Sequence, residues 1–419
     1  MEKQRTYFCI DMKSFYASVE CAERGLSPFE TNLVVADPSR GKGAICLAIS
    51  PKMKTLGVKN RCRLFDIPKD MDYIIAKPRM KKYIDVAADI YEIYLDYISK
   101  DDIHVYSIDE SFIDATDYLN MYKMSAKEFA TMLMDLIAKK TGVPSTAGIG
   151  TNMYLAKIAL DITAKHSPDH IGYLDEDLYK KQLWDHMPIT DFWQVARGTA
   201  NRLKKFGINT MRDITNADSN LLYDTFGINA ELLIDHAWGR EPCTIADIKA
   251  YKSRSKSVST TQILFEDYDY DKSLLVMTEM ALNMCQEMMK RHVCANNVGI
   301  QVRYSKDIRP STGATRKMSE TTNVFSIIKG YVKTLFEETT YKDVPIRGLG
   351  IFFNVVGEGS EGYDLFTDYD KVEKEKKGEM AILDIKSKFG KNAIIRGMDL
   401  KEGATAQIRN KLVGGHNGE

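Results

Sequence analysis

The sequence of 419 residues has no run of about 18 apolar residues, the length that a membrane-spanning helix requires. Its opening stretch, MEKQRTYFCID, is charged and then only briefly apolar, which is too short for the core of a signal peptide. We therefore expect no membrane segment and a cytoplasmic protein. The length predicts about three domains.

Cysteine pairs with the spacing of metal or redox sites are also absent. The seven cysteines are scattered, and none forms a CxxC pair. This spacing indicates neither a zinc site nor a thiol redox motif. Reduced, mostly buried thiols of a cytosolic protein are the better interpretation.

The chain has no net charge, with 58 Lys and Arg residues against 58 Asp and Glu residues. Proteins that bind nucleic acids are usually basic, so this balance argues weakly against such binding. Local basic patches can still bind phosphates, and an acidic catalytic centre would offset them in the total. Basic residues gather at Lys52, Lys54, Lys59, Arg61 and Arg63. The charge permits DNA binding without demonstrating it.

Three acidic residues stand within or at the end of apolar strand patterns. Asp11 follows the apolar run 6–10, and the adjacent Asp109 and Glu110 interrupt a strand pattern over 104–116. A carboxylate among apolar residues is costly unless it is paired or binds a metal ion. Asp11 alone could cap the helix that follows it, but an adjacent acidic pair inside a strand is harder to explain in that way. Two Mg²⁺ ions held by such oxygens can activate a hydroxyl and neutralise phosphates. The residues themselves predict metal-dependent phosphoryl transfer.

Three segments resemble, in order, the motifs of the Y-family DNA polymerases. They are IDMKSFYASVE (10–20), YSIDESFID (106–114) and AGIGTNMYLAKIALDITAKHSPDHIG (147–172). The SPKMKTLGV stretch and the C-terminal extension favour the UmuC branch, and within it the UvrX-type members of Gram-positive bacteria. The resemblance implies a translesion DNA polymerase of low fidelity that adds dNTPs to a primer 3′-hydroxyl on primer–template DNA, in DNA repair and damage tolerance.

The resemblance also assigns the metal site and the sugar gate. Asp11, Asp109 and Glu110 would hold two Mg²⁺ ions, for which Mn²⁺ can substitute, and the Met12 carbonyl would be an added ligand. The Tyr16 ring would be the steric gate that collides with a ribose 2′-hydroxyl.

The nucleotide contacts implied by the resemblance lie in both the first and the third motif. Backbone amides of Phe15 and Tyr16 would receive the triphosphate, and Lys157 would face it as a point charge. The chain departs from the family pattern at Pro51 and Lys54, where many members have Tyr and Arg. A bidentate contact thereby becomes a single charge, and Ser50 or Lys52 could supply the missing contact.

Two residues stand where the family often has small side chains above the nascent base pair. Ile45 and Leu47 are bulkier than those side chains, and a bulkier roof leaves less room for a distorted template base. We expect a narrower range of bypassed lesions than in the most permissive relatives.

The fold class implied is a multi-domain α+β protein with the right-hand arrangement of a polymerase. The expected domains are a palm (1–25 and 79–170), fingers (26–78), a helical thumb (171–241), a linker (242–253), a C-terminal α/β little finger (254–356) and a tail (357–419).

Candidate DNA contacts come from the thumb and the little finger. Residues 195–208 resemble a helix-hairpin-helix, in which Gly198 is kept and Ala196 replaces a second glycine; an ordinary helical pair is the alternative. Such contacts grip phosphates without reading sequence. The further candidates, each of which could also be a plain surface residue, are Lys252, Arg254, Lys256, Thr260, Arg303, Arg316 and Lys317.

The segment 362–366 resembles the short peptide with which family members bind the sliding clamp. Leu365 and Phe366 would be its apolar anchors. It lacks the usual glutamine, and a tail that packs on the little finger is the alternative. Two rival functions remain from the sequence alone: a nucleotide cyclase with a similar sheet, and a non-catalytic DNA-binding scaffold.

Overall fold

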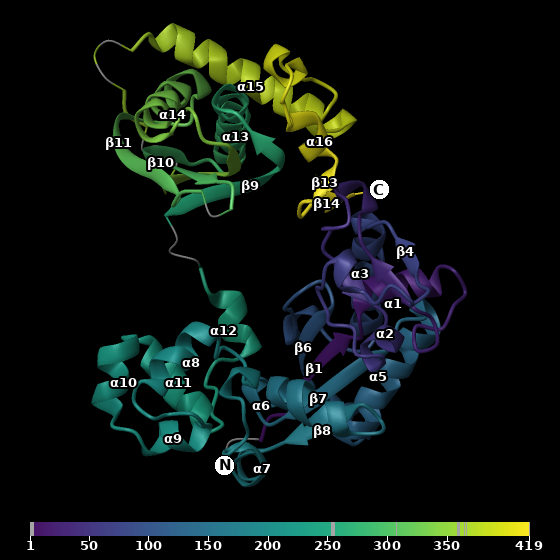
Figure 1. Ribbon diagram of the computed structural model, residues 1–419. Helices are drawn as coiled ribbons and strands as arrows, with labels where there is room; N and C mark the ends of the chain where they lie inside the picture. Colours follow the sequence, from purple (N-terminus) through teal and green to yellow (C-terminus); the bar gives the residue numbers. More distant parts are fainter. Residues whose placement is uncertain are drawn as a thin grey trace. The chain divides into compact units, whose positions relative to one another are not determined.

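The computed structural model describes residues 4–252, 256–306, 308–357, 361–363, 365 and 367–418, without the side chain of His166. The chain divides into two compact units, residues 1–252 with 418–419 and residues 253–417. Among the described residues no helix is long and apolar enough to cross a membrane. Figure 1 shows the elements of each unit.

A five-stranded sheet with the order β5-β6-β1-β7-β8 is the centre of the first unit. β1 pairs antiparallel with both β6 and β7, and β7 pairs parallel with β8. Alternation along β1 puts Phe8, Ile10 and Met12 into the main core, while Cys9 packs with a second cluster on the other face. The strands are β1 (Tyr7–Met12), β5 (Ile103–Val105), β6 (Glu110–Asp114), β7 (Ser145–Gly150) and β8 (Ile171–Leu174).

Helices flank this sheet, and their ends follow local sequence signals. Helix α5 begins at the capping box of Ser125 and Glu128 and ends at Gly142, whose φ of 70° suits glycine. The helices here are α1 (Phe15–Ala22), α3 (Met80–Leu95), α4 (Thr116–Tyr122), α5 (Ala126–Thr141) and α6 (Met153–Ile158).

The sequence pattern suggested that the acidic pair interrupts a single strand, and the structure shows a different arrangement. The chain reverses over 106–109, so the pattern over 104–116 covers two antiparallel strands, β5 and β6. The amides of Tyr106 and Ser107 both donate to the Glu110 carbonyl oxygen at 3.0 Å, which closes the turn. Asp109 therefore lies in a turn, and Glu110 opens β6.

Residues 33–76 form a small separate sheet with the order β3-β2-β4. It has its own apolar cluster, which includes Val34, Cys46 and Met53. The elements are β2 (Leu33–Val35), β3 (Ala48–Ile49), α2 (Pro51–Thr55) and β4 (Ile74–Ala76). This part corresponds to the predicted fingers.

The remainder of the first unit is helical. Two helical pairs turn at Gly207 and Gly227, whose φ angles are 76° and 61°. The expected linker (242–253) is partly wrong, because helix α12 occupies its centre, begins at a capping box of Thr244 and Asp247, and buries Ile245. The helices are α7 (Glu176–Leu183), α8 (Arg197–Lys204), α9 (Met211–Asn216), α10 (Ser219–Phe226), α11 (Asn229–Ala237) and α12 (Ile245–Ala250).

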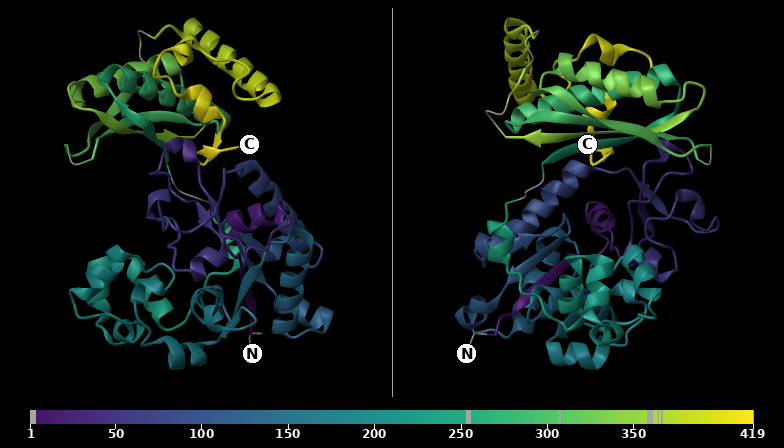
Figure 2. Two further views of the ribbon diagram at one scale, coloured as in Figure 1. Left: turned by 45° about the vertical axis from the view of Figure 1, so that its right-hand side comes forward. Right: turned by 90° about the vertical axis from the view of Figure 1, so that its left-hand side faces the viewer.

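The second unit is built on a four-stranded antiparallel sheet with the order β11-β10-β12-β9. Two helices cover one face of this sheet and leave the other open, as Figure 2 shows. The elements are β9 (Ser257–Tyr268), α13 (Tyr270–Lys290), β10 (Cys294–Tyr304), β11 (Thr312–Thr322), α14 (Phe325–Thr339) and β12 (Ile346–Val356). Their order matches the strands and helices expected for a little finger.

Much of the expected C-terminal tail is folded against helix α13. The buried Glu279 of α13 accepts hydrogen bonds from the amide and hydroxyl of Thr405, both at 3.0 Å. Gln286 donates to Glu379 at 3.0 Å. The elements are α15 (Tyr369–Phe389), α16 (Ala406–Asn410), β13 (Leu412–Val413) and β14 (His416–Asn417). These parts of the tail therefore pack on the second unit, and their contacts do not involve the segment 362–366.

Candidate active site

The pairing of β1 with β6 brings the three predicted carboxylates to one place. Asp11 and Glu110 are direct cross-strand partners, and the Met12 amide donates to the Asp109 carbonyl oxygen at 2.9 Å. Cross-strand partners project from the same face of a sheet. The Ser107 hydroxyl donates to the Asp109 carboxylate at 2.6 Å and so orients it.

The electrostatics at this site are those of crowded negative charge. Burial, together with the neighbouring Asp109 and Glu110, raises the pKa of Asp11 to about 7. A divalent cation would relieve this repulsion, and carboxylate oxygens are the ligands that Mg²⁺ prefers. The kind of donor and their proximity therefore fit the implied metal ions.

Glu110 is held away from such a role by two neighbours. Lys157 of α6 lies 2.9 Å from its carboxylate, and the Cys9 thiol donates to it at 3.0 Å. Lys157 also contacts Asp161 at 3.1 Å. In this arrangement no three acidic, thiol or imidazole groups among the described residues form a metal cluster. Lys157 thus binds a carboxylate, where the resemblance implied a triphosphate contact.

Other lysines gather near Asp11 instead. Burial lowers the pKa of Lys54, nearby Lys165 lowers it further, and Asp11 opposes the shift. Burial also lowers the pKa of Lys13, with Asp11 raising it and Lys54 lowering it. Lys54 is thus the lysine influenced both by Asp11 and by Lys165, and Lys13 is influenced by Asp11 and Lys54. The sequence pointed to Lys54 only.

A π-helical turn separates the two lysines of the third motif. It spans Ala159–Thr163, between Lys157 and Lys165. The wider turn shifts the helical register, and such turns often occur at functional sites. Lys165 is exposed while Lys157 is buried. The motif spacing alone gave no sign of this turn.

Ser50 is engaged in local structure. Its hydroxyl donates to the Thr31 carbonyl oxygen at 2.7 Å and accepts from the amides of Leu33 at 3.3 Å and Met53 at 3.4 Å. The residue is fully buried as the N-cap of α2. These contacts leave its side chain committed to the backbone, which argues against its predicted contact with the nucleotide.

The predicted gate, Tyr16, is backed by a second tyrosine. The rings of Tyr16 and Tyr83 stack with centroids 4.6 Å apart and planes at 22°. The Tyr83 hydroxyl donates to Glu20 at 2.9 Å, and Arg79 donates to both oxygens of Glu20 at 2.9 and 3.0 Å. A fully buried Glu20 carboxylate, paired with a partly exposed Arg79, therefore supports the tyrosine behind the gate. Phe15, beside Tyr16, is buried.

Replacing Glu20 with alanine is expected to lower the free energy of unfolding by about 3 kcal/mol, because it leaves buried partners uncompensated. Urea denaturation at neutral pH measures the change. The matched control is Glu23→Ala on the same helix end, where an exposed pair with Lys82 at 2.8 Å contributes less than about 1 kcal/mol. Equal losses in the two variants would contradict the assignment.

The two predicted roof residues differ in environment. Ile45 is 48% exposed, whereas Leu47 is half-buried and packs against the main core. Both lie between β2 and α2 in the chain. Ile45 is therefore the side chain that is free to contact a base pair.

The candidate DNA contacts of the second unit fall on both faces of its sheet. Thr260 pairs with the core residue Ile351, and Arg316 pairs with the core residue Val298 and reaches Glu338 of α14 at 2.7 Å. These two candidates lie on the helix-covered side, so their prediction as DNA contacts is corrected. Arg303 and Lys317 alternate with core positions and lie on the open face.

The remaining candidates for partner binding lie at exposed positions. Lys252 and Lys256 are exposed. A Cβ added at Gly198 would meet no atom within 4 Å among the described residues, so the backbone at the start of α8 is open. Leu365 is 98% exposed. Arg254 and Phe366 lie outside the described residues.

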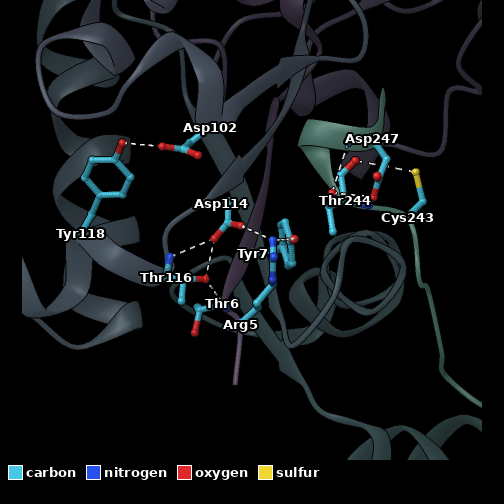
Figure 3. Close-up of polar contacts among 10 residues, drawn as sticks. All are labelled: Arg5, Thr6, Tyr7, Asp102, Asp114, Thr116, Tyr118, Cys243, Thr244 and Asp247. Atoms are coloured by element: carbon cyan, nitrogen blue, oxygen red, sulfur yellow. Dashed lines mark hydrogen bonds and ion pairs between the residues drawn. The ribbon is translucent and has the colours of Figure 1, made fainter. Parts of the chain in front are cut away.

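A group of acids at the other end of β6 has structural partners. Asp114 accepts from the Thr116 amide at 3.1 Å and pairs with Arg5 at 3.2 Å, as Figure 3 shows. In the same view Asp102 accepts from the Tyr118 hydroxyl at 2.6 Å, and Asp247 caps α12. These local partners give Asp114 a structural role, apart from the three predicted metal-binding acids.

Two family models match the chain. The model described as the impB/mucB/samB family matches residues 10–161, and that of its C-terminal domain matches residues 255–362. The putative UV-damage repair protein UvrX of Bacillus subtilis (strain 168) is 30% identical, over 99% of this chain and 98% of that protein. DNA polymerase IV 2 of the same organism is 31% identical, over 99% of this chain and 100% of that protein.

A solved structure shares the fold. The Y-family DNA polymerase chimera Dbh-Dpo4(243-245)-Dbh aligns with a TM-score of 0.64 at 19% identity, over 83% of this chain and 98% of that chain. The chain belongs to the Y-family DNA polymerases. This Y-family polymerase has the mixed α/β fold with a C-terminal sheet domain that the sequence predicted, and the predicted family is confirmed. Polymerases of this family depend on divalent metal ions.

Proposed function

We propose that this chain adds dNTPs to a primer 3′-hydroxyl with two metal ions held by Asp11, Asp109 and Glu110. Family membership makes the chain a DNA polymerase of the lesion-bypass class, and the names of its relatives set this activity in DNA repair. The observation that carries the site assignment is the pairing of Asp11 with Glu110, next to Asp109 in the turn.

Each residue of the proposed site would have its own role in nucleotidyl transfer. The two Mg²⁺ ions, when bound, would activate the 3′-oxygen and neutralise the triphosphate charge, and Mn²⁺ could take their place. Asp11 and Asp109 would bind both ions, and Glu110 would exchange Lys157 for one of them. The Met12 carbonyl would add a ligand, and the amides of Phe15 and Tyr16 would orient the phosphates.

Lys54 and Lys165 would neutralise part of the negative charge of the triphosphate. Replacing Lys165 with alanine is expected to raise KM for dNTP about 10-fold with little change in kcat, because a ground-state phosphate contact is lost. Lys157→Ala is expected to leave KM for dNTP unchanged, since Lys157 contacts the Glu110 carboxylate and not the phosphates. Steady-state kinetics of the two variants decide, and a rise in KM confined to Lys157→Ala would return the triphosphate role to that residue.

The roof residue Ile45 is expected to narrow the lesion range. In primer extension on templates with a small and a bulky lesion, the wild type should stall at the bulky one. Ile45→Ala should reduce the ratio of the two insertion rates by about 10-fold, the size of effect expected when a side chain of this size is removed. Leu47→Ala, at the half-buried neighbour, is the control for general loosening. Equal insertion by the wild type opposite both lesions would contradict the proposal.

DNA would be gripped without sequence preference by the open face of the second unit and by the start of α8. Lys317, Arg303 and Lys256 support this proposal by their exposure or position. Binding through phosphates predicts a steep loss of affinity with salt. Leu365 would be the described anchor of a clamp-binding peptide, and the cytoplasm would be the site of action.

Extension of a primed template with Mg²⁺ and single dNTPs tests the function. Incorporation directed by the template base supports it. The rival cyclase would release a cyclic nucleotide from a triphosphate without primer, and the rival scaffold would bind primed DNA without extending it. Either result would replace the polymerase proposal.

A further inference from the structure

The turn that carries Asp109 is short, and hydrogen bonds among its own residues close it. Its closing contacts are the amides of Tyr106 and Ser107 on the Glu110 carbonyl oxygen, both at 3.0 Å. The Ser107 hydroxyl then orients the Asp109 carboxylate at 2.6 Å. A displacement of Tyr106 would therefore be passed along three residues to the carboxylate.

Trp193 holds this turn from the helical part of the first unit. Its indole Nε1 donates to the Tyr106 hydroxyl at 3.1 Å. Its ring lies 5.8 Å from the ring of Tyr106 at 82° and 5.8 Å from that of Phe112 in β6. The edge-to-face pair with Tyr106 is favourable beyond the area it buries. Trp193 thus contacts the hairpin at two points, on either side of the acidic pair.

Trp193 also belongs to a series of stacked rings within the first unit. It stacks on His236 of α11 at 6.0 Å and 18°, and His236 stacks on Tyr154 of α6 at 4.0 Å and 17°. His236, which is 2% exposed, is also fixed by Glu241 at 3.0 Å. Along the chain, Trp193 stands two residues before the predicted helix-hairpin-helix at 195–208.

We infer that Trp193 is a positioning residue for nucleotidyl transfer, which fixes the Asp109 turn to the helices that would hold the DNA. The inference rests on the proposed function, because it assumes that Asp109 binds the metal ions. Through the hydrogen bond from Trp193 to Tyr106, the helices proposed to bind DNA would help to set the position of the Asp109 carboxylate.

Two single substitutions and their combination test the link. Tyr106→Phe and Trp193→Phe each remove the same hydrogen bond while keeping a ring in place. Each is expected to lower kcat about 10-fold, to raise the Mg²⁺ concentration for half-maximal rate, and to leave KM for dNTP unchanged. The double variant should be no slower than the slower single, because both changes break one interaction.

The matched control is Trp184→Phe. This tryptophan also lies among the helices, and its Nε1 donates to the Ala237 carbonyl oxygen at 2.8 Å, away from the turn. It should keep the wild-type kcat and Mg²⁺ dependence. Because Tyr106 is 46% exposed, Tyr106→Phe should fold even if Trp193→Phe does not.

The inference would be overturned if Tyr106→Phe kept the wild-type kcat and Mg²⁺ dependence. It would also be overturned if the losses of kcat in the two single variants added up in the double variant. Asp109→Ala is assayed in parallel. If it is inactive while the phenylalanine variants are normal, the inference alone fails. Activity that survives in Asp109→Ala overturns the proposed site and the inference together.

Discussion

Replacing Asp109 with alanine is expected to lower kcat for single-nucleotide incorporation at least about 1,000-fold, which corresponds to about 4 kcal/mol. The physical reason is the small number of oxygen ligands at the site. Without Asp109, Asp11 would remain with Glu110, which is already bound by Lys157 at 2.9 Å. The measurement is primer extension with saturating DNA and Mg²⁺, under single-turnover conditions.

The control for this substitution is Asp89→Ala. Asp89 lies on α3, the helix that packs beneath the same sheet, but it is exposed to solvent. Its loss should leave both kcat and thermal stability unchanged. Incorporation in Asp109→Ala within tenfold of the wild type would show that another group binds the metal ions.

Replacing Tyr16 with alanine is expected to raise the ratio of ribonucleotide to deoxyribonucleotide incorporation about 100-fold, on the order of 3 kcal/mol. A gate discriminates only if its ring cannot retreat. The stack on the fully buried Tyr83, 4.6 Å away, blocks retreat in that direction. The ratio of kcat/KM for matched rNTP and dNTP pairs is the measurement.

Tyr16→Phe is the informative control for the gate. It keeps the ring and removes only the hydroxyl, so sugar selection should stay near that of the wild type. Unchanged selection in Tyr16→Ala would mean that the ring does not touch the sugar, and loss of selection in both variants would assign the role to the hydroxyl.

The convergence of the acids could be predicted because strands impose a simple rule. Asp11 ends an apolar strand, and Glu110 opens another, so pairing alone brings them together. The face of β9 could not be predicted in the same way. Ser259, Thr260, Thr261 and Gln262 are polar in succession, so alternation does not show which of them face the helices. Thr260 was misplaced for this reason.

Other differences come from local geometry that spacing does not reveal. The π-helical turn after Ile158 shifts the helical register between Lys157 and Lys165, and no residue in it signals a wider turn. The helix within the expected linker did carry a signal. Thr244 and Asp247 have the spacing of a capping box, but the polar composition around them concealed it.

The docking of the C-terminal segment on α13 sets a limit on how the protein can be shortened. The match to the C-terminal family model ends at residue 362, yet Glu279 and Gln286 complete their hydrogen bonds with Thr405 and Glu379. Cutting the chain after β12 would leave a charged carboxylate and an amide without partners on a helix that faces the sheet. A fragment that ends at the boundary of the family model would therefore expose polar groups of α13 that are buried and hydrogen-bonded in the intact chain.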